Sequence, residues 1–329
     1  MTEEKMVYKC EGGPMFISFD VTSLCNLECL HCFNNSSAVA GDDLTDAEAL
    51  SVAQQIAEFS PVTICICGGE PMLRKNLFSI IECVSKTAAN VSMVCNGYYI
   101  DECNAQQLKQ AGLKVLQISL DGINSIQHDT LRGKAGSFDK AVEAIKIGVN
   151  VGLQVYVSLV PSKLNYRTIS QFIEMCYSLG VLSTRIMPLI PMGRGSNMEK
   201  LLLSSEEYIE LQLAIQNEKE KYNNIPYLIE WGDPLDHYTR MQNNAKLGSN
   251  NLSAEIKSNG NITVSTYIPV VVGNIRKHSL KEYWDAGYKD IWKNEKFVNY
   301  ISSIQTIYDL NCLNPRPYSG EYLYIDLID

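Results

Sequence analysis

"MFISFDVTSLCNLECLHC" (residues 15–32) joins a short apolar run to three cysteines, Cys25, Cys29 and Cys32, at a C-x3-C-x2-C spacing. The apolar run resembles a buried parallel strand in its length and composition. Three thiols in one loop can converge on one centre, and soft thiolates favour zinc or an iron–sulfur cluster over hard cations. A closed zinc site needs a fourth Cys or His, whereas a four-iron cluster held by three cysteines keeps one iron free for a substrate or cofactor. From the spacing alone, an iron–sulfur cluster, a zinc knuckle and three incidental thiols all stay open.

The pattern of an apolar run followed by an amphipathic segment repeats along the first two-thirds of the chain. Six such strand–helix units in succession predict an α/β fold, either a partial (β/α)6 TIM-like barrel or an open sheet. Ligands of these folds bind at the carboxyl ends of the strands. The cysteine loop directly follows the first run, so we expect it at that end. After the first run, the strand-like runs lie at 62–67, 91–95, 114–120, 154–160 and 183–190, and the helical patterns lie at 44–59, 77–87, 104–112, 137–148 and 166–180. Thr45 and Glu48 fit a capping box at the start of the first helical pattern.

The pattern changes after residue 197. Ser204 and Glu207 fit a capping box at the start of a long polar helix. The stretch "AEIKSNGNITVST" follows and predicts a hairpin that turns at Asn259-Gly260. We therefore divide the chain into residues 1–197, the barrel, and 198–329, a small α+β domain.

Composition limits the class of protein. The chain has 329 residues, of which 46% are hydrophobic, and 28 Lys and Arg against 37 Asp and Glu give a net charge of −9 without a basic run. Nucleic acid and membranes are therefore not expected partners. The N-terminus lacks the order of a signal peptide, and no apolar stretch reaches the length of a membrane span, about 18 residues, so we expect a cytoplasmic protein. Eleven cysteines in a reducing compartment are metal ligands, reactive thiols or small buried residues rather than disulfides.

The cysteine loop resembles that of the radical S-adenosylmethionine (SAM) enzymes. These proteins share the C-x3-C-x2-C spacing, with an aromatic residue or histidine before the last cysteine, the place that His31 occupies here. The resemblance implies one [4Fe–4S] cluster on Cys25, Cys29 and Cys32, with SAM bound to the fourth iron. An electron from the cluster would then split SAM into methionine and a 5'-deoxyadenosyl radical, which takes a hydrogen atom from the substrate.

Two more stretches are similar to SAM-binding motifs of that family. "GGEP", which is Gly68, Gly69, Glu70 and Pro71, follows the second run, and the similar family motif contacts the amino group of SAM. Glycines allow a close backbone approach, and a carboxylate accepts from an ammonium group. "CNG" (95–97) stands where the family often has "TNG", which places Asn96 near the cofactor. Taken alone, GGEP also fits a plain turn after a strand.

The end of the fourth run adds polar residues. In "SLDG" (119–122), Ser119 and Asp121 share one face of an extended strand, and the similar family segment binds the ribose and the methionine part of SAM. Arg132 resembles the arginine that binds the SAM carboxylate, for which a bidentate fork is suited. "PMGRG" (191–195) resembles the close of the sixth strand in these enzymes. Without the resemblance, Asp121 fits a turn cap and Arg132 a solvated surface charge.

The C-terminal segment "NGNITVSTYIPVVVGNIRKHSLKEYW" is similar to the SPASM or twitch extension of peptide-maturing and tetrapyrrole-modifying members. Ser265 and Thr266 stand where the extension carries a cluster cysteine, and hydroxyls do not replace thiolates. Beyond residue 200 the sequence holds only Cys312. We therefore predict a single cluster, with this domain as scaffold and substrate cradle. Cys312 is a candidate hydrogen-atom donor or a buried structural thiol, and the thiols in the apolar strand and helix patterns are expected to be small buried residues.

The sequence thus predicts a radical SAM enzyme that modifies a ribosomally synthesised peptide. The chain has about fourteen residues before the first run, so no separate leader-binding domain is expected. The alternatives are a tetrapyrrole or another small-molecule substrate, and a non-catalytic iron–sulfur electron carrier. An external electron donor such as flavodoxin or ferredoxin is an expected partner.

Overall fold

Six parallel strands form the centre of the fold in the computed structural model, which describes residues 12–232, 234–305 and 323–328. Each strand pairs in parallel with the next along the chain, which confirms the predicted α/β succession. The sixth strand ends earlier than the sequence predicts, before Pro188, because proline cannot donate to a strand ladder. The strands are β1 (Phe16–Thr22), β2 (Thr63–Gly68), β3 (Asn90–Cys95), β4 (Val115–Ser119), β5 (Gln154–Leu159) and β6 (Ser183–Ile186).

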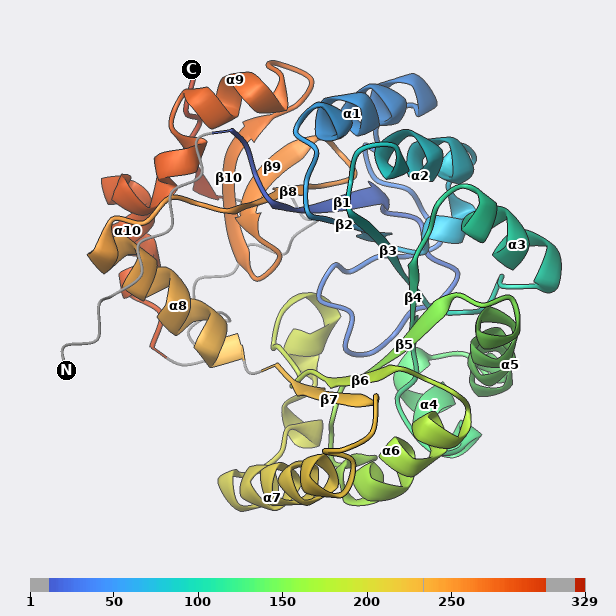
Figure 1. Ribbon diagram of the computed structural model, residues 1–329. Helices are drawn as coiled ribbons and strands as arrows, with labels where there is room; N and C mark the ends of the chain where they lie inside the picture. The colour runs from blue at the N-terminus through green and yellow to red at the C-terminus, as the bar shows by residue number, and fades with distance from the viewer. Residues whose placement is uncertain (1–11, 233, 306–322, 329) are drawn as a thin grey trace.

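Helices cover the convex face of the curved sheet, while the loop after β1 lies inside the curve (Figure 1). The predicted capping box starts the first helix, because Thr45 and Glu48 exchange side-chain-to-backbone hydrogen bonds. Among the helices that lie between β1 and β6, α4 (Ser125–Arg132) was not predicted, because its eight residues are short of apolar positions; it ends at Gly133, whose φ is 71°. The others are α1 (Asp46–Glu58), α2 (Leu77–Ser85), α3 (Glu102–Gln110), α5 (Ser137–Asn150) and α6 (Ile169–Ser178), with short helices η1 (Pro71–Leu73) and η2 (Tyr166–Thr168).

The chain after residue 197 extends the same sheet at both ends. A seventh parallel strand, β7, which the sequence analysis missed, pairs with β6 on one side. On the other side β8 pairs in parallel with β1, and β8, β9 and β10 form the predicted antiparallel hairpin and its continuation. The strand order is β11-β10-β9-β8-β1-β2-β3-β4-β5-β6-β7, so the sheet is open between β11 and β7. The predicted division at residue 197 stays a prediction.

The remaining elements complete this part of the chain. Ser204 and Glu207 form the predicted capping box of the long helix, and Ser279 and Glu282 form a second one. The elements are η3 (Gly193–Asn197), η4 (Glu199–Leu201), α7 (Ser205–Lys221), β7 (Leu228–Trp231), α8 (Pro234–Leu247), β8 (Ser253–Ile256), β9 (Asn261–Ser265), β10 (Ile268–Asn274), α9 (Leu280–Asp285), η5 (Tyr288–Lys293), α10 (Glu295–Ser302) and β11 (Leu323–Tyr324).

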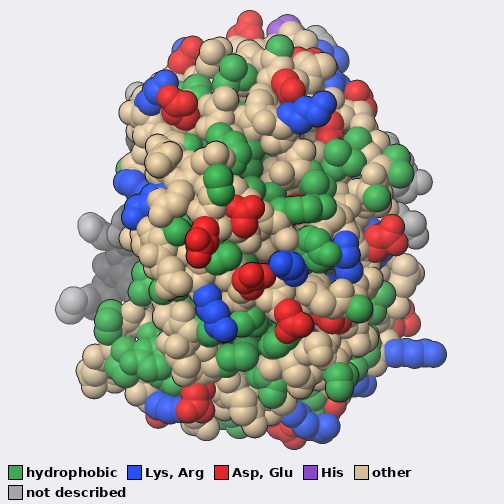
Figure 2. Space-filling view, turned by 90° about the vertical axis from the view of Figure 1, so that its right-hand side faces the viewer, with side chains coloured by type: hydrophobic (Ala, Val, Ile, Leu, Met, Phe, Trp, Pro, Cys, Tyr) green, Lys and Arg blue, Asp and Glu red, His purple; other side chains and the backbone are tan. Residues whose placement is uncertain are grey.

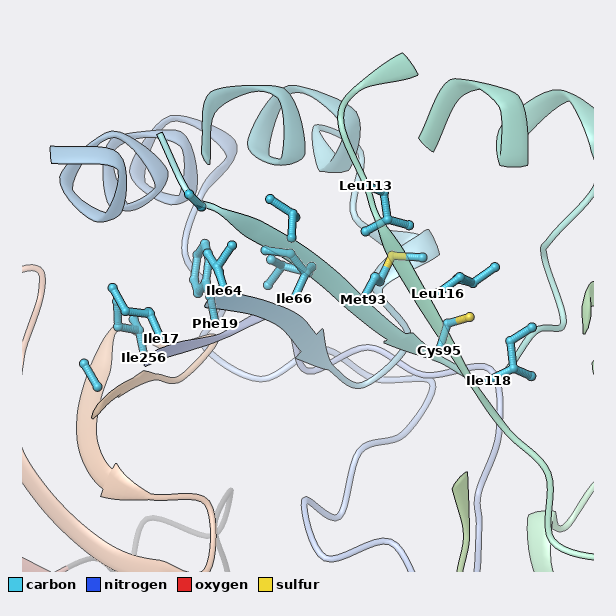
Figure 3. Close-up of a cluster of buried hydrophobic side chains, with 14 of the residues drawn as sticks. Ile17, Phe19, Ile64, Ile66, Met93, Cys95, Leu113, Leu116, Ile118 and Ile256 are labelled. Carbon is cyan, nitrogen blue, oxygen red and sulfur yellow. The ribbon is translucent and has the colours of Figure 1, made fainter. Parts of the chain in front are cut away.

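The two faces of the sheet differ in polarity. Side chains that face the helices are apolar and fully buried, such as Phe19, Ile66 and Ile118 (Figure 3). The alternate positions of the same strands, such as Ser18 and Cys67, face the inside of the curve and line a cavity. The hydrophobic core therefore lies between strands and helices, and the concave side is left for polar residues.

Figure 2 shows one face of the molecule, on which acidic and basic side chains are interspersed. Neither charge dominates the described residues of that face. Within the described residues, no helix is both long enough and apolar enough to span a membrane.

Candidate active site

A cavity of about 440 Å³ opens at the carboxyl ends of the strands, and the cysteine loop forms one of its walls. Cys25, Cys29 and Cys32 all line it, as the sequence predicts. The other walls come from segments that are far apart in the sequence. They include Gly68, Gly69, Asn96, Ser119, Arg132, Ser158, Met187, Arg194 and Tyr267.

The glycines of GGEP hold the cysteine loop by direct backbone contact. Gly69 N donates to the carbonyl oxygen of Thr22 at 2.8 Å, and Glu70 N donates to that of Leu24 at 2.7 Å. A Cβ built on Gly69 would overlap the Leu24 carbonyl oxygen, and one on Gly68, whose φ is +126°, would overlap that of Thr22. Both positions therefore require glycine, because the loop that carries the cysteines lies where a side chain would be.

Glu70 and Asn96 connect GGEP to the end of β3. The Glu70 carboxylate accepts from Asn96 N at 2.8 Å and from Met72 N at 3.1 Å. Burial raises the pKa of Glu70 to about 7, although these two N–H groups act to lower it. Glu70 and Pro71 are buried and lie behind the cavity wall, whereas Asn96 lines the cavity. The Asn96 amide nitrogen donates to Asn26 Oδ1 at 2.8 Å and lies 3.9 Å from Cys25 Sγ.

A buried ion pair lies on the opposite side of the cysteine loop. Arg132 Nε lies 2.6 Å from Asp121 Oδ2, and Arg132 Nη1 lies 3.8 Å from Cys29 Sγ. Burial acts to raise the pKa of Asp121, but Arg132 and His31 hold it below its ordinary value. Ser119 lines the cavity, but Asp121 does not, because β4 ends at Ser119 and the strand alternation ends with it. Asp121 instead fixes the position of two residues that do face the cavity.

His31 is one of those two residues. Its Nε2 lies 3.3 Å from Asp121 Oδ2, and burial lowers its pKa to about 4. The imidazole is therefore neutral near pH 7, with its proton on Nε2 toward the carboxylate. This leaves Nδ1 as a hydrogen-bond acceptor.

Arg194 is a site residue that the sequence analysis missed. It lies in the "PMGRG" stretch, which marked the end of the sixth strand, although the arginine itself was not singled out. Its backbone N donates to Cys32 O at 2.9 Å, Nε donates to Cys29 O at 2.8 Å and Nη1 donates to Ser36 O at 2.8 Å. The neighbouring Gly193 has a φ of 54°, and a Cβ there would overlap the carbonyl oxygens of Cys32 and Phe33. The loop after β6 therefore holds the cysteine loop at Cys29, Cys32 and Ser36, whereas GGEP holds it at its start.

The thiols fit a metal cluster rather than a free metal ion. Burial raises the pKa of Cys25 to about 12, and burial also raises that of Cys29 despite the opposing charge of Arg132. Both thiols stay protonated until a cationic metal centre replaces their protons. No group of three or more His, Cys, Asp or Glu side chains within the described residues is arranged around a single metal ion. A cluster does not need that arrangement, since each thiolate binds a different iron.

Unpaired polar atoms point to a second, polar ligand in the same cavity. His31 Nδ1, Asn34 Oδ1, Ser36 Oγ and Arg194 Nη2 are buried and have no hydrogen-bond partner in the part of the chain that the structure describes. All four residues line the cavity. Buried polar groups are rarely left unpaired, so these atoms fit a ligand with both donors and acceptors. The amino, carboxylate and hydroxyl groups of SAM provide both.

Asp20 lines the cavity and belongs to a buried group of charged residues beside it. Lys257 Nζ lies 2.6 Å from Glu255 Oε1 and 3.3 Å from Asp20 Oδ2, and all three side chains are buried. Thr266 Oγ1 donates to Glu255 Oε1 at 2.6 Å. Thr266 and Tyr267, from the β9–β10 turn, line the cavity. The turn in which a cluster cysteine was expected thus provides hydroxyl groups to the cavity.

The sequence analysis also made predictions about cysteines outside the cluster loop. Cys95 and Cys176 are buried, as expected of small core residues. Cys65 and Cys67 line the cavity, because they occupy alternate positions on the concave face of β2. Cys312, the hydrogen-donor candidate, lies outside the described residues.

Comparisons with known proteins agree with this geometry. A model of the radical SAM superfamily matches residues 19–176. The chain is 26% identical over 295 residues to an AdoMet-dependent heme synthase of Methanosarcina barkeri, a match that covers 83% of each protein. It is 31% identical over 216 residues to a probable GTP 3',8-cyclase of Saccharolobus islandicus, which covers 64% of this chain and 69% of that protein.

A further relative and a solved structure of similar fold complete the comparison. The sporulation killing factor maturation protein SkfB of Bacillus subtilis is 26% identical over 227 residues, which are 69% of this chain and 55% of SkfB. The chain thus spans about half the length of SkfB. The structure of Streptococcus suis SuiB bound to its precursor peptide SuiA has a TM-score of 0.68 at 15% identity, and covers 90% of this chain and 68% of SuiB. At that identity the likeness shows a shared fold.

Proposed function

The chain belongs to the radical SAM superfamily, and we propose that it takes a hydrogen atom from a residue of a ribosomally synthesised peptide. It is an enzyme whose cofactors are a [4Fe–4S] cluster and SAM. When bound, these cofactors supply a 5'-deoxyadenosyl radical that abstracts hydrogen from the substrate. The chain's own residues must therefore hold both cofactors and present one substrate carbon to them.

In this proposal, Cys25, Cys29 and Cys32 hold the cluster. The three loops that contact the cysteine loop fix those sulfurs: GGEP by backbone hydrogen bonds, Arg132 by its contact with Cys29 and Arg194 by its bonds to carbonyl oxygens. The unpaired atoms of His31 and Arg194 would bind polar groups of SAM. Preorganised polar groups of this kind require no rearrangement when the ligand arrives.

The polar groups of the cavity are the observation from which we propose a peptide substrate. The cavity presents hydroxyl, thiol, amide, carboxylate and guanidinium groups, among them Ser18, Asp20, Gln117 and Arg185. A peptide brings one donor and one acceptor per residue, which can pair with such groups. The flat apolar face of a tetrapyrrole would cover them without pairing them, and each unpaired buried polar group costs about 1–3 kcal/mol.

Relatives support two substrate classes. SkfB is named as a maturation protein of sporulation killing factor, which favours a peptide. The M. barkeri heme synthase matches more of the chain, 83%, and favours a tetrapyrrole side chain as the second candidate. The open edge of the sheet between β11 and β7 suits either, because part of a large substrate can remain outside the cavity.

The test uses the anaerobically reconstituted chain with SAM and a one-electron donor, dithionite first and then flavodoxin or ferredoxin. A short peptide encoded beside the gene is compared with an iron porphyrin that carries propionate groups. The proposal predicts 5'-deoxyadenosine formation that rises with the peptide, and a mass or stereochemical change in the peptide. A rise with the porphyrin alone would replace the peptide with the second candidate, and no 5'-deoxyadenosine at all would overturn both.

A further inference from the structure

Arg185, on the concave face of β6, lines the cavity, with a side chain that is 43% exposed. We infer that Arg185 binds a carboxylate of the substrate, which under the proposed function is the side chain of a Glu or Asp residue in the peptide. The residue has no role in holding the cluster loop, and nothing in the sequence motifs assigns it one.

Side chains from β7 and β4 hold the guanidinium in place. Arg185 Nε donates to Glu230 Oε2 on β7 at 3.0 Å, and Nη1 donates to Gln117 Oε1 on β4 at 3.1 Å. Glu230 is itself fixed by a hydrogen bond from Ser183 Oγ at 2.8 Å. Within residues 12–232, 234–305 and 323–328, the guanidinium makes its hydrogen bonds through Nε and Nη1, and Nη2 makes none. The planar group thus has a fixed orientation and an edge that is free to bind a ligand.

The other cations at this cavity are already engaged. Arg132 pairs with Asp121, and Arg194 donates to the cysteine loop through Nε and Nη1. Lys257 is buried between Asp20 and Glu255, two carboxylates that balance its charge. Within the described residues, Arg185 is therefore the cavity-lining cation that the substrate can reach.

The Arg185–Glu230 pair does not prevent a second carboxylate from binding. Both side chains are partly exposed, at 43% and 38%, and an ion pair of this kind contributes little on its own. A guanidinium has five N–H donors, so it can bind Glu230, Gln117 and a ligand carboxylate at once. Such charge-assisted bonds are about twice as strong as neutral ones and favour a planar, bidentate partner.

Arg185 lines the same cavity as the three cysteines. The cysteine loop lies at the carboxyl ends of the strands, and Arg185 lies within β6 itself, in register with Ser158 of β5. A carboxylate bound there would hold its side chain inside the cavity that the cysteine loop also lines. The anchor thereby determines which residue type of the peptide is presented.

Binding of matched probes tests the inference. The probes are the tripeptides acetyl-Ala-Glu-Ala-amide and acetyl-Ala-Gln-Ala-amide, which differ in charge but hardly in size. They are titrated by calorimetry into the reconstituted, SAM-loaded enzyme without reductant, so that no turnover occurs. The enzyme is compared with Arg185→Gln, Arg185→Lys and the exposed control Arg167→Gln. Arg167 packs on the ring of Tyr166, outside the cavity.

We expect wild type and Arg167→Gln to bind the Glu peptide about ten-fold or more tightly than the Gln peptide. Arg185→Gln should bind both equally, and Arg185→Lys should retain only part of the preference because it lacks the fork. Three results would overturn the inference: equal binding of both peptide probes by wild type, a preference that persists in Arg185→Gln, or no binding of the Glu probe together with no Arg185-dependent binding of a porphyrin. A propionate-bearing porphyrin serves as the second arm. If its binding depends on Arg185 while neither peptide binds, the peptide function fails but the carboxylate anchor stands.

Discussion

Gly69→Ala is the sharpest perturbation of the contact between GGEP and the cysteine loop. The added methyl group would overlap the carbonyl oxygen of Leu24 and lie 2.8 Å from that of Ser23. Gly69 does not have a positive φ, so alanine is conformationally allowed and the effect is purely steric. The neighbours are backbone atoms, which cannot rotate away as a side chain would.

The size of the effect follows from these contacts. The two loops must separate by about 1 Å to bring the methyl group to an ordinary distance, and overpacking of this kind costs about 1–3 kcal/mol. The hydrogen bond from Glu70 N to Leu24 O, now 2.7 Å, would be lost at that separation. Because the cysteine loop moves with Leu24, the three sulfurs lose their fixed positions. Disturbing residues that orient metal ligands typically weakens metal binding about 10–100-fold.

The assay has two parts, thermal unfolding of the metal-free chain and iron release from the reconstituted chain into a chelator. Gly69→Ala should unfold at a lower temperature and release iron about ten-fold or more faster than wild type. Gly12→Ala is the matched control, since a Cβ there meets nothing within 4 Å. If Gly69→Ala matches wild type in both measurements, the glycines do not act by the contact described above.

Two further predictions concern buried charges. Lys257→Met leaves Asp20 and Glu255 without their cation, so the free energy of unfolding in urea should fall by about 3–5 kcal/mol. His128→Asn keeps an acceptor for Asp121 N, which now donates to His128 Nδ1 at 3.0 Å. Burial lowers the pKa of His128 from 6.5 to about 4, so the folded state binds fewer protons than the unfolded state between these values. The stability that this shift contributes, about 3 kcal/mol, is present above pH 6.5 and is lost as the pH falls toward 4, and His128→Asn should flatten that part of a melting-temperature profile.

Each of these predictions has a clear contrary result. Lys200→Met, at an exposed position, controls for the loss of a charge. If Lys257→Met is as stable as Lys200→Met, the buried network contributes nothing to the fold. A pH profile of His128→Asn that runs parallel to wild type would show that His128 is not the acid-sensitive group.

Local signals in the sequence predicted local structure well. The capping boxes at Thr45 and Ser204 depend on residues three positions apart, and both helices start as predicted. The apolar runs predicted all six central strands, because each run by itself has the length and the apolar composition of a buried strand. The short elements α4 and β7 were not predicted, because eight and four residues are too few to show a clear hydrophobic period.

Long-range features could not be predicted in this way. Lys257 and Asp20 are 237 residues apart and meet only because β8 pairs with β1, a pairing that no local pattern encodes. The alternating polar positions of the strands were visible, as in Asp20 and Cys67, but short apolar runs were interpreted as buried on both faces. Arg185 and Arg194 became site residues only when the curve of the sheet brought them to the cavity.

The central claim is that Cys25, Cys29 and Cys32 hold the one cluster of this chain. Iron and sulfide per chain, measured after anaerobic reconstitution of wild type and of a variant with all three changed to alanine, test it most directly. The account predicts about four irons in wild type and close to none in the variant. Eight or more irons in wild type, or about four retained by the variant, would contradict it.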